Sequence, residues 1–225
     1  MKIGGMYDII TMYNYIMGKY AVRLKRFAYM RIILASKSPR RKEILENLGL
    51  NFEIIVADAD ESCDIKDPCA LVKEIASRKG RAVVEQLSES DNDTLVIACD
   101  TLVYAEGEFL GKPCDRADAV RMIRLLSGRE HSVISGAYLW YSGREATCFA
   151  ETRVSFDEIA DEVIESYVDT PEPYDKAGAY AIQGTASIFI RGIRGDYFNV
   201  VGLPVNALCS ALKEKFSIDI FEIRN

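Results

Sequence analysis

Histidine is nearly absent from this chain of 225 residues, in which His131 is the only one. A serine or cysteine nucleophile activated by a triad needs a positioned imidazole, so we expect no such triad and interpret His131 as a strand residue. The six cysteines form no C-x-x-C pair, and with one histidine beside them a structural zinc site is not expected. We interpret them as reduced thiols of a cytoplasmic protein, where they usually serve as small buried side chains.

Long apolar runs and an excess of positive charge are missing as well. No stretch reaches the ~18 uncharged apolar residues that a membrane helix requires. The net charge is −6, from 28 basic and 34 acidic residues. These features argue against a membrane or a large duplex nucleic acid as partner. What remains is an ordinary globular composition, 49% hydrophobic and 28% charged, in a chain long enough to bury a core.

Residues 1–29 differ from the rest, because tyrosine, methionine and a basic stretch are concentrated there. They lack the small-residue cleavage site of a signal peptide, and their apolar positions near helical spacing predict an amphipathic helix. Two interpretations stay open: an accessory helix, or an upstream start that precedes a natural first residue at Met30. We therefore expect one domain over 30–225, preceded by an extension or a misassigned start.

Strand and helix patterns alternate early in the chain, and antiparallel strand patterns follow later. This order predicts a mixed α/β fold, with a twisted sheet flanked by helices and two lobes around a central cleft. A Ser142-Gly143 turn predicts a hairpin between the two longest strands. Strands are predicted at 31–35, 51–56, 94–99, 131–141, 145–156 and 187–193, and helices at 42–49, 68–87, 115–126, 161–168 and 204–216.

The segment Ser36-Lys37-Ser38-Pro39-Arg40-Arg41 joins the first strand to the first helix. Ser38 suits the N-cap, and proline suits the first helical position. A helix start presents free N–H groups and a positive dipole end, and arginine forks match phosphate oxygens. The segment therefore indicates an anion site, although a capped surface helix with a solvated basic turn explains the same residues.

Asp100 and Thr101 directly follow the apolar strand pattern at 94–99. A carboxylate at the end of a buried strand can hold a divalent cation or accept a proton from water. The alternative is that Asp100 merely begins a turn. Residues 58–62 form an acidic run that offers further metal ligands or is a solvated loop. Lys79 and Lys112 are candidate phosphate ligands, or surface lysines of the usual kind.

Eight segments resemble the Maf proteins in order and spacing, a family of nucleotide pyrophosphatases related in fold to the inosine triphosphatases. The resemblance runs from Arg31 to about Leu212. It rests on ILASKSPRR (33–41), DE (60–61), ACDTLV (98–103), GKP (111–113), LSG (126–128), ETRV (151–154), YAIQG (180–184) and GDYFNVVGLP (195–204).

The resemblance implies hydrolysis of a nucleoside triphosphate to the monophosphate and pyrophosphate, with Mg²⁺ or Mn²⁺ as cofactor. It implies that Asp100 is the general base. We expect Glu61, with Asp100, to hold the metal, because carboxylates are hard oxygen ligands. We expect four further residues to bind the triphosphate: Ser36, Arg41, Lys79 and Lys112. A homodimer is compatible with the family.

Base specificity is assigned by the resemblance to Arg40, Thr101 and Gln183. All three match the branch that acts on dTTP and UTP, and not the branch that acts on 7-methyl-GTP. Gln183 carries both a donor and an acceptor, which suits O4 and N3–H of a pyrimidine. Two positions depart from the family: Gly80 stands where alanine is usual, and Cys99 where alanine or glycine is usual.

Two other functions fit the same residues. One is a non-catalytic nucleotide-binding regulator of cell division, against which the intact Asp100, Glu61 and Lys79 argue. The other is an enzyme that prefers purine nucleotides such as ITP. A nucleotide panel with product analysis separates all three.

Overall fold

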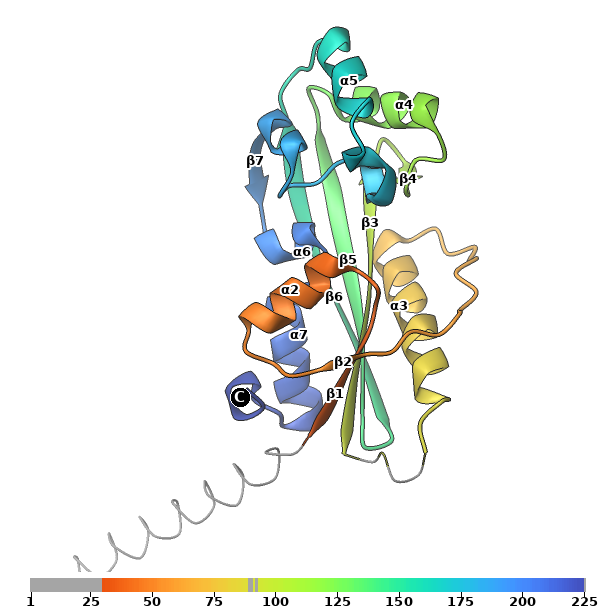
Figure 1. Cartoon of the computed structure of the whole chain (residues 1–225), viewed down its shortest axis with the longest axis vertical. Coiled ribbons are helices and arrows are strands. Elements are labelled where there is room, and N and C mark those ends of the chain that lie inside the picture. Colours follow the sequence, from red (N-terminus) through yellow and green to blue (C-terminus); the bar gives the residue numbers. More distant parts are fainter. Residues whose placement is uncertain (1–29, 89–90, 92, 225) are drawn as a thin grey trace, which may run out of the picture.

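The computed structural model describes residues 30–88, 91 and 93–224, so the proposed extension at 1–29 lies outside the described residues. A seven-stranded sheet has the order β2-β1-β3-β5-β6-β7, with β4 paired to β3 (Figure 1). β1 runs parallel to β2 and β3, and the other pairs are antiparallel. The predicted mixed sheet is thus confirmed. Its strands are β1 (Arg31–Ala35), β2 (Glu53–Ile54), β3 (Thr94–Ala105), β4 (Glu108–Leu110), β5 (Glu130–Tyr141), β6 (Arg144–Phe156) and β7 (Ile190–Arg194).

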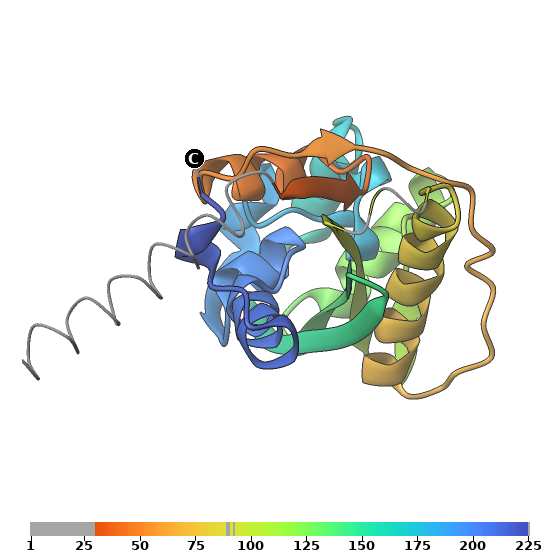
Figure 2. The ribbon, with the colours of Figure 1, turned by 90° about the horizontal axis from the view of Figure 1, so that it is seen from below.

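Helices flank both faces of the sheet, as predicted (Figures 1 and 2). Successive side chains of a strand point to opposite faces, so β3 presents Val96 to α3 and Ile97 to α2 and α7. α4 and α5 pack at the other end of the long strands. The helices are α2 (Pro39–Asn47), α3 (Pro68–Val84), α4 (Arg116–Leu126), α5 (Asp161–Val168), α6 (Tyr197–Val201) and α7 (Val205–Ala211).

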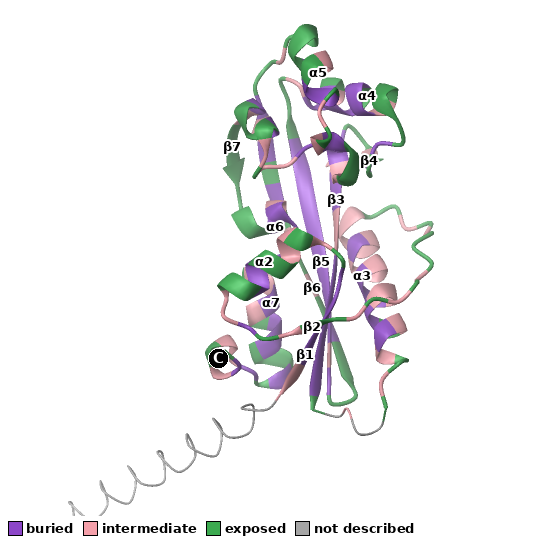
Figure 3. Cartoon of the chain, in the orientation of Figure 1, coloured by how far each residue is buried: buried purple, intermediate pink, exposed green. Residues whose placement is uncertain are grey.

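The long strand β3 belongs to both ends of the molecule. Leu95 and Ile97 lie in the cluster formed with α2 and α7, whereas Val103 and Ala105 lie in the cluster formed with α4 and α5. Figure 3 shows buried residues along β3 and β5, while β7 at the sheet edge is mostly exposed. Both helical clusters are therefore attached to one continuous sheet.

Helix α3 approaches the sheet unusually closely, at two glycines. A Cβ at Gly80 would lie 2.0 Å from Cδ1 of Tyr138, and a Cβ at Gly136 would lie 2.8 Å from the Val72 carbonyl. The ring of Tyr138 thus fills the space that a side chain at position 80 would need. This contact with β5 fixes the height of α3 above the sheet one residue away from Lys79.

Several predicted boundaries were wrong. The strand predicted to end at Cys99 continues to Ala105, because β5 pairs with it along its length, as in Thr101↔Ser135 and Leu102↔Ile134. β2 is shorter than the strand predicted at 51–56. The segment predicted as a strand at 187–193 begins within the 3₁₀ helix Thr185–Phe189, and the helix predicted at 204–216 changes to a π-helical turn at Leu212–Phe216. α6 was missed. Within the described chain, no helix combines the length and apolarity needed to cross a membrane.

Candidate active site

The cleft lies where one edge of β3 is left without a partner strand. β1 ends at Ala35, opposite Ala98, and β4 begins to pair only at Val103. Among the described residues, no strand pairs with this edge between those two positions. A cleft of about 1120 Å³ opens there. Asp100 and Thr101 therefore lie in the middle of β3, beside the end of β1. The sequence had predicted them at the end of their own strand or at the start of a turn.

Asp100 and Thr101 serve opposite faces of the sheet. Asp100 shares the face of Val96 and meets α3, whereas Thr101 shares the face of Ile97 and meets α2. The alternation of a β-strand explains this division. Both residues line the cleft because it wraps around the free edge.

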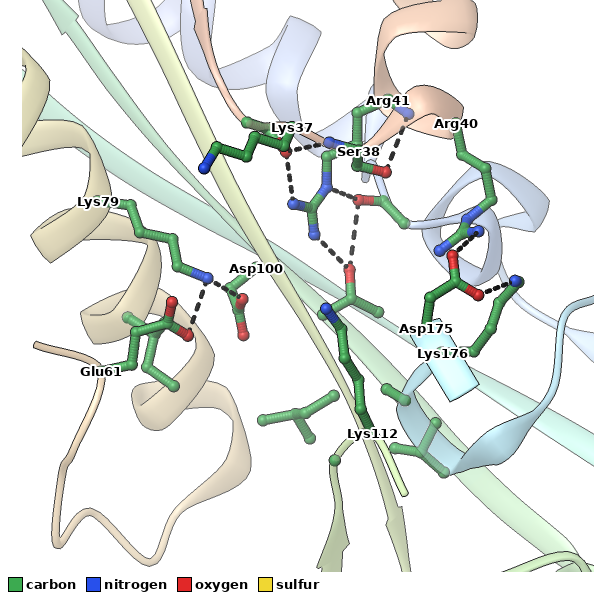
Figure 4. A pocket seen from close by; sticks show the side chains of 18 of the residues that line it. Lys37, Ser38, Arg40, Arg41, Glu61, Lys79, Asp100, Lys112, Asp175 and Lys176 are labelled. Atoms are coloured by element: carbon green, nitrogen blue, oxygen red, sulfur yellow. Dashed lines mark hydrogen bonds and ion pairs between the residues drawn. The ribbon is translucent and has the colours of Figure 1, made fainter. Parts of the chain in front are cut away.

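On the α3 side, Lys79 lies between two carboxylates (Figure 4). Its Nζ is 2.7 Å from Oδ1 of Asp100 and 3.0 Å from Oε2 of Glu61. The side chains of Asp100 and Lys79 are 17% and 22% exposed, and that of Glu61 is 55% exposed. Glu61 comes from the loop before α3, within the acidic run, so the structure brings these three predicted site residues together.

Ser36 and Arg41 form the α2 side, and the predicted cap is confirmed. Ser38 is the N-cap of α2 and its hydroxyl accepts from the Arg41 backbone N–H, with proline at the first helical position. The Arg41 guanidinium donates to the Gly202 carbonyl at 2.8 Å, to Ser36 Oγ at 3.0 Å and to Thr101 Oγ1 at 3.1 Å. Arg41 is thus held in one orientation before any ligand binds.

A buried polar network lies behind Thr101, and it was not predicted from the sequence. Thr101 Oγ1 and Ser135 Oγ are 2.8 Å apart, and Ser135 donates to the Asn199 carbonyl. Asn199 is fully buried, accepts from the Ser135 N–H and donates to Thr152 and the Val133 carbonyl. These partners occupy the Thr101 hydroxyl, and one of them is the Arg41 guanidinium. An isolated asparagine in an apolar run was the only available signal.

Gln183 and Lys112 also line the cleft. Gln183 is exposed, and the Lys37 and Lys112 ammonium groups lack a hydrogen bond or ion pair within the described part of the chain. Arg40 Nη1 lies 3.7 Å from Oδ2 of Asp175. Lys37, Asp175 and Lys176 line the cleft but were not among the predicted site residues. Asp175 and Lys176 follow two prolines in a segment without periodicity, so no local pattern marked them.

Cys99 is buried directly behind the site. Its Sγ–H points at the Gly202 carbonyl, 3.3 Å away, and burial raises the pKa of the thiol to about 11. The thiol is therefore neutral near pH 7 and is a poor nucleophile. His131 is buried in a strand as predicted, and its Nε2 lies 2.7 Å from the Tyr180 hydroxyl. Neither residue supplies a second reactive group.

The α3 side fits a divalent cation. Two carboxylates already hold one positive charge, the Lys79 ammonium, between them. Mg²⁺ is commonly bound through one or two carboxylates, with water and substrate phosphates filling its remaining positions. Across the described residues, no group of three or more His, Cys, Asp or Glu side chains forms a cage for a metal by itself. The donor set therefore suits a cation that arrives with a phosphate ligand.

A family model described as "Maf-like protein" matches residues 31–215. The chain belongs to the Maf family. This Maf chain is 45% identical over 191 residues to a protein of Caldanaerobacter subterraneus subsp. tengcongensis called "dTTP/UTP pyrophosphatase", covering 84% of this chain and 91% of that protein. Proteins with the same name from Thermoanaerobacter sp. and Bacillus anthracis are each 44% identical over 84% of this chain, covering 98% and 97% of their own lengths. The family resemblance drawn from the sequence is thereby confirmed.

Proposed function

We propose that this Maf protein hydrolyses dTTP and UTP to the nucleoside monophosphate and pyrophosphate. The observation that carries the proposal is the position of Asp100, a carboxylate held by a lysine in a cleft lined with cations. The names of the relatives support the reaction and the bases. The described residues would then form one catalytic unit, with two lobes around the cleft as in the inosine triphosphatases.

Cations in the cleft account for binding of the triphosphate. Lys37 and Lys112 have no competing acidic partner in the described chain, and Arg41 is fixed by three oxygen acceptors. A guanidinium that is already oriented loses little freedom on binding phosphate. Phosphoryl transfer depends mainly on such positioning and on neutralised charge. Ser36 contributes by holding Arg41, in addition to its predicted contact with phosphate.

Asp100 is proposed to accept the proton of the water that attacks the α-phosphorus. Its Oδ1 accepts a hydrogen bond from Lys79 Nζ, which holds the carboxylate in place in the cleft. A divalent cation, when bound, would neutralise charge on the phosphates, with Glu61 and Asp100 as its protein ligands. Lys79 then has two predicted roles, orienting Asp100 and stabilising negative charge that develops on the phosphate.

Selection of the base is proposed for Arg40, Thr101 and Gln183. The exposed amide of Gln183 offers a donor and an acceptor on the cleft wall. Thr101 would contribute indirectly, because its hydroxyl is bonded to Arg41. This arrangement favours a pyrimidine that carries an oxygen at C4 and a proton at N3.

The test replaces Asp100 with Asn and measures pyrophosphate release from dTTP and UTP in the presence of Mg²⁺. We expect kcat to fall by about 10²- to 10⁴-fold, the usual contribution of a general base. Asp169→Asn is the matched control, because Asp169 pairs with Arg116 and is not a lining residue of the cleft. Near-normal turnover of Asp100→Asn would refute its role. Saturable nucleotide binding without any product from the wild type would favour the non-catalytic regulator instead.

A further inference from the structure

Asp175 is a carboxylate in a cleft that is otherwise built for phosphate. It ends the 3₁₀ helix Glu172–Asp175 on the wall opposite α2, and its side chain points toward Arg40 (Figure 4). A negative charge here repels a triphosphate through the same long-range interaction that makes the neighbouring cations attractive. Its presence therefore needs an explanation other than phosphate binding.

Both oxygens of Asp175 have cationic partners. Oδ2 lies 3.7 Å from Nη1 of Arg40, and Oδ1 is paired with Nζ of Lys176. Burial alone would raise the pKa of Asp175, but the hydrogen bond from Lys176 and the charges of Lys176 and Arg40 outweigh it and hold the pKa below its usual value. The carboxylate therefore stays ionised and is available to hold Arg40.

Lys176 anchors this arrangement to the protein. Its side chain is only 14% exposed, and Nζ donates to the Glu172 carbonyl at 3.1 Å. A lysine this buried gives up its usual hydration for fixed partners. Asp175 is thus held on one side by a rigid cation and contacts Arg40 with its other oxygen.

Glu172 connects the same unit to the segment that carries Gln183. Its carboxylate accepts from the backbone N–H groups of Thr185 at 2.7 Å and Ala186 at 3.1 Å. A Cβ at Gly184 would lie 2.3 Å from Glu172 Oε1, so the carboxylate packs directly against the residue after Gln183. One short stretch, 172–176, therefore touches Arg40 through Asp175 and supports Gln183 through Glu172.

We propose that Asp175 is a positioning residue for base selection, which holds Arg40 in register with Gln183. Lys176 and Glu172 fix Asp175 and the Gln183 segment to one another. The inference rests on the proposed function, because Arg40 and Gln183 are its predicted specificity residues. Discrimination among nucleotides then depends on a residue that contributes no favourable contact to the triphosphate.

The test compares the wild type with Asp175→Asn, which keeps the shape and removes the charge. For each protein, kcat/KM is measured with dTTP, UTP, dCTP and dGTP. We expect the ratio of dTTP to dCTP to fall about two- to fivefold, the range for one partly exposed ion pair. The loss should appear mainly in KM. Asp175→Glu should recover part of the ratio, and the control Asp169→Asn should leave it unchanged.

A double-mutant cycle with Arg40→Ala tests whether the effect passes through Arg40. In the Arg40→Ala background, Asp175→Asn should cause no further loss of selectivity. If Asp175 acted only by repelling the triphosphate, Asp175→Asn in the wild-type background would lower KM equally for every nucleotide and leave the kcat/KM ratios unchanged. That outcome, expected from relief of repulsion alone, overturns the proposal.

Failure of the proposed function is recognised separately. It appears as a wild type that releases no pyrophosphate from any nucleotide. In that case the same ratios are measured as dissociation constants by calorimetry, where the proposal makes the same prediction. If Asp175→Asn leaves the ratio of the dissociation constants for dTTP and dCTP unchanged, the proposal is overturned in that case as well.

Discussion

Replacing Gly80 with alanine adds a single methyl group at the closest contact between α3 and the sheet. The new Cβ would lie 2.0, 2.5 and 2.9 Å from Cδ1, Cε1 and Cγ of Tyr138. Carbon atoms pack at about 3.5–4.0 Å, so the ring or the helix must move by roughly 1.5 Å. The ring is fully buried and its hydroxyl donates to Glu145 at 2.8 Å, which leaves the helix as the part that moves.

Stability and activity should respond differently to this shift. Overpacking costs about 1–3 kcal/mol, and alanine regains about 1 kcal/mol over glycine within a helix. The expected net loss in the free energy of unfolding is therefore about 0–2 kcal/mol. Lys79 is the adjacent residue, and its 2.7 Å contact with Asp100 moves with the helix. A displacement of about 1 Å in a catalytic site costs on the order of 100-fold.

Urea unfolding and steady-state release of pyrophosphate from dTTP measure the two effects on one preparation. Gly192→Ala is the control, because a Cβ there meets nothing within 4 Å. The second variant is Gly80→Ala with Tyr138→Leu, in which the smaller side chain makes room for the methyl group. We expect the pair to recover activity relative to Gly80→Ala alone. Full activity in Gly80→Ala alone would show that the reasoning about helix height is wrong.

Two further predictions follow from charges in and behind the site. Lys79→Gln should lower kcat for dTTP by about 10²- to 10³-fold, because it removes the cation that orients Asp100 and faces the phosphates; steady-state kinetics with saturating Mg²⁺ measures this. His131 is buried, which lowers its pKa from 6.5 to about 4. The unfolded chain binds this proton at a higher pH than the folded chain does. The free energy of unfolding should therefore fall by up to about 1.4 kcal/mol per pH unit as the pH decreases from 6.5 to 4. Urea unfolding across that range should show a smaller fall for His131→Gln, and equal slopes would contradict the assignment.

Local signals were predictable from the sequence, and long-range pairings were not. The Ser38 cap, the proline after it and the hairpin at Ser142-Gly143 depend on neighbouring residues, and all were confirmed. The predicted end of β3 was wrong because a polar Asp-Thr pair ends the apolar run in the sequence. In the structure, pairing with β5 continues the strand through these two residues.

The candidate site divides in the same way. Asp100, Lys79 and Glu61 were predicted as site residues from the sequence and lie in contact in the structure, although their chemical roles stay predictions. Asp175 was not predicted as a site residue because its contact with Arg40 joins distant parts of the chain. Asn199 escaped notice because its burial depends on the packing of α6 against β5 and β6.

The continuous sheet has a mechanical consequence for the cleft. The free edge of β3 at Asp100 lies opposite an unbroken ladder, since β5 pairs with β3 from Leu95 to Tyr104. A hinge across this point would have to break backbone hydrogen bonds in the buried centre of the molecule, and each such group left without a partner is costly. Opening the cleft by a hinge in the sheet is therefore energetically unfavourable. Any widening of the cleft therefore has to come from segments attached to the sheet, such as the turn before α2, and not from bending of β3 and β5.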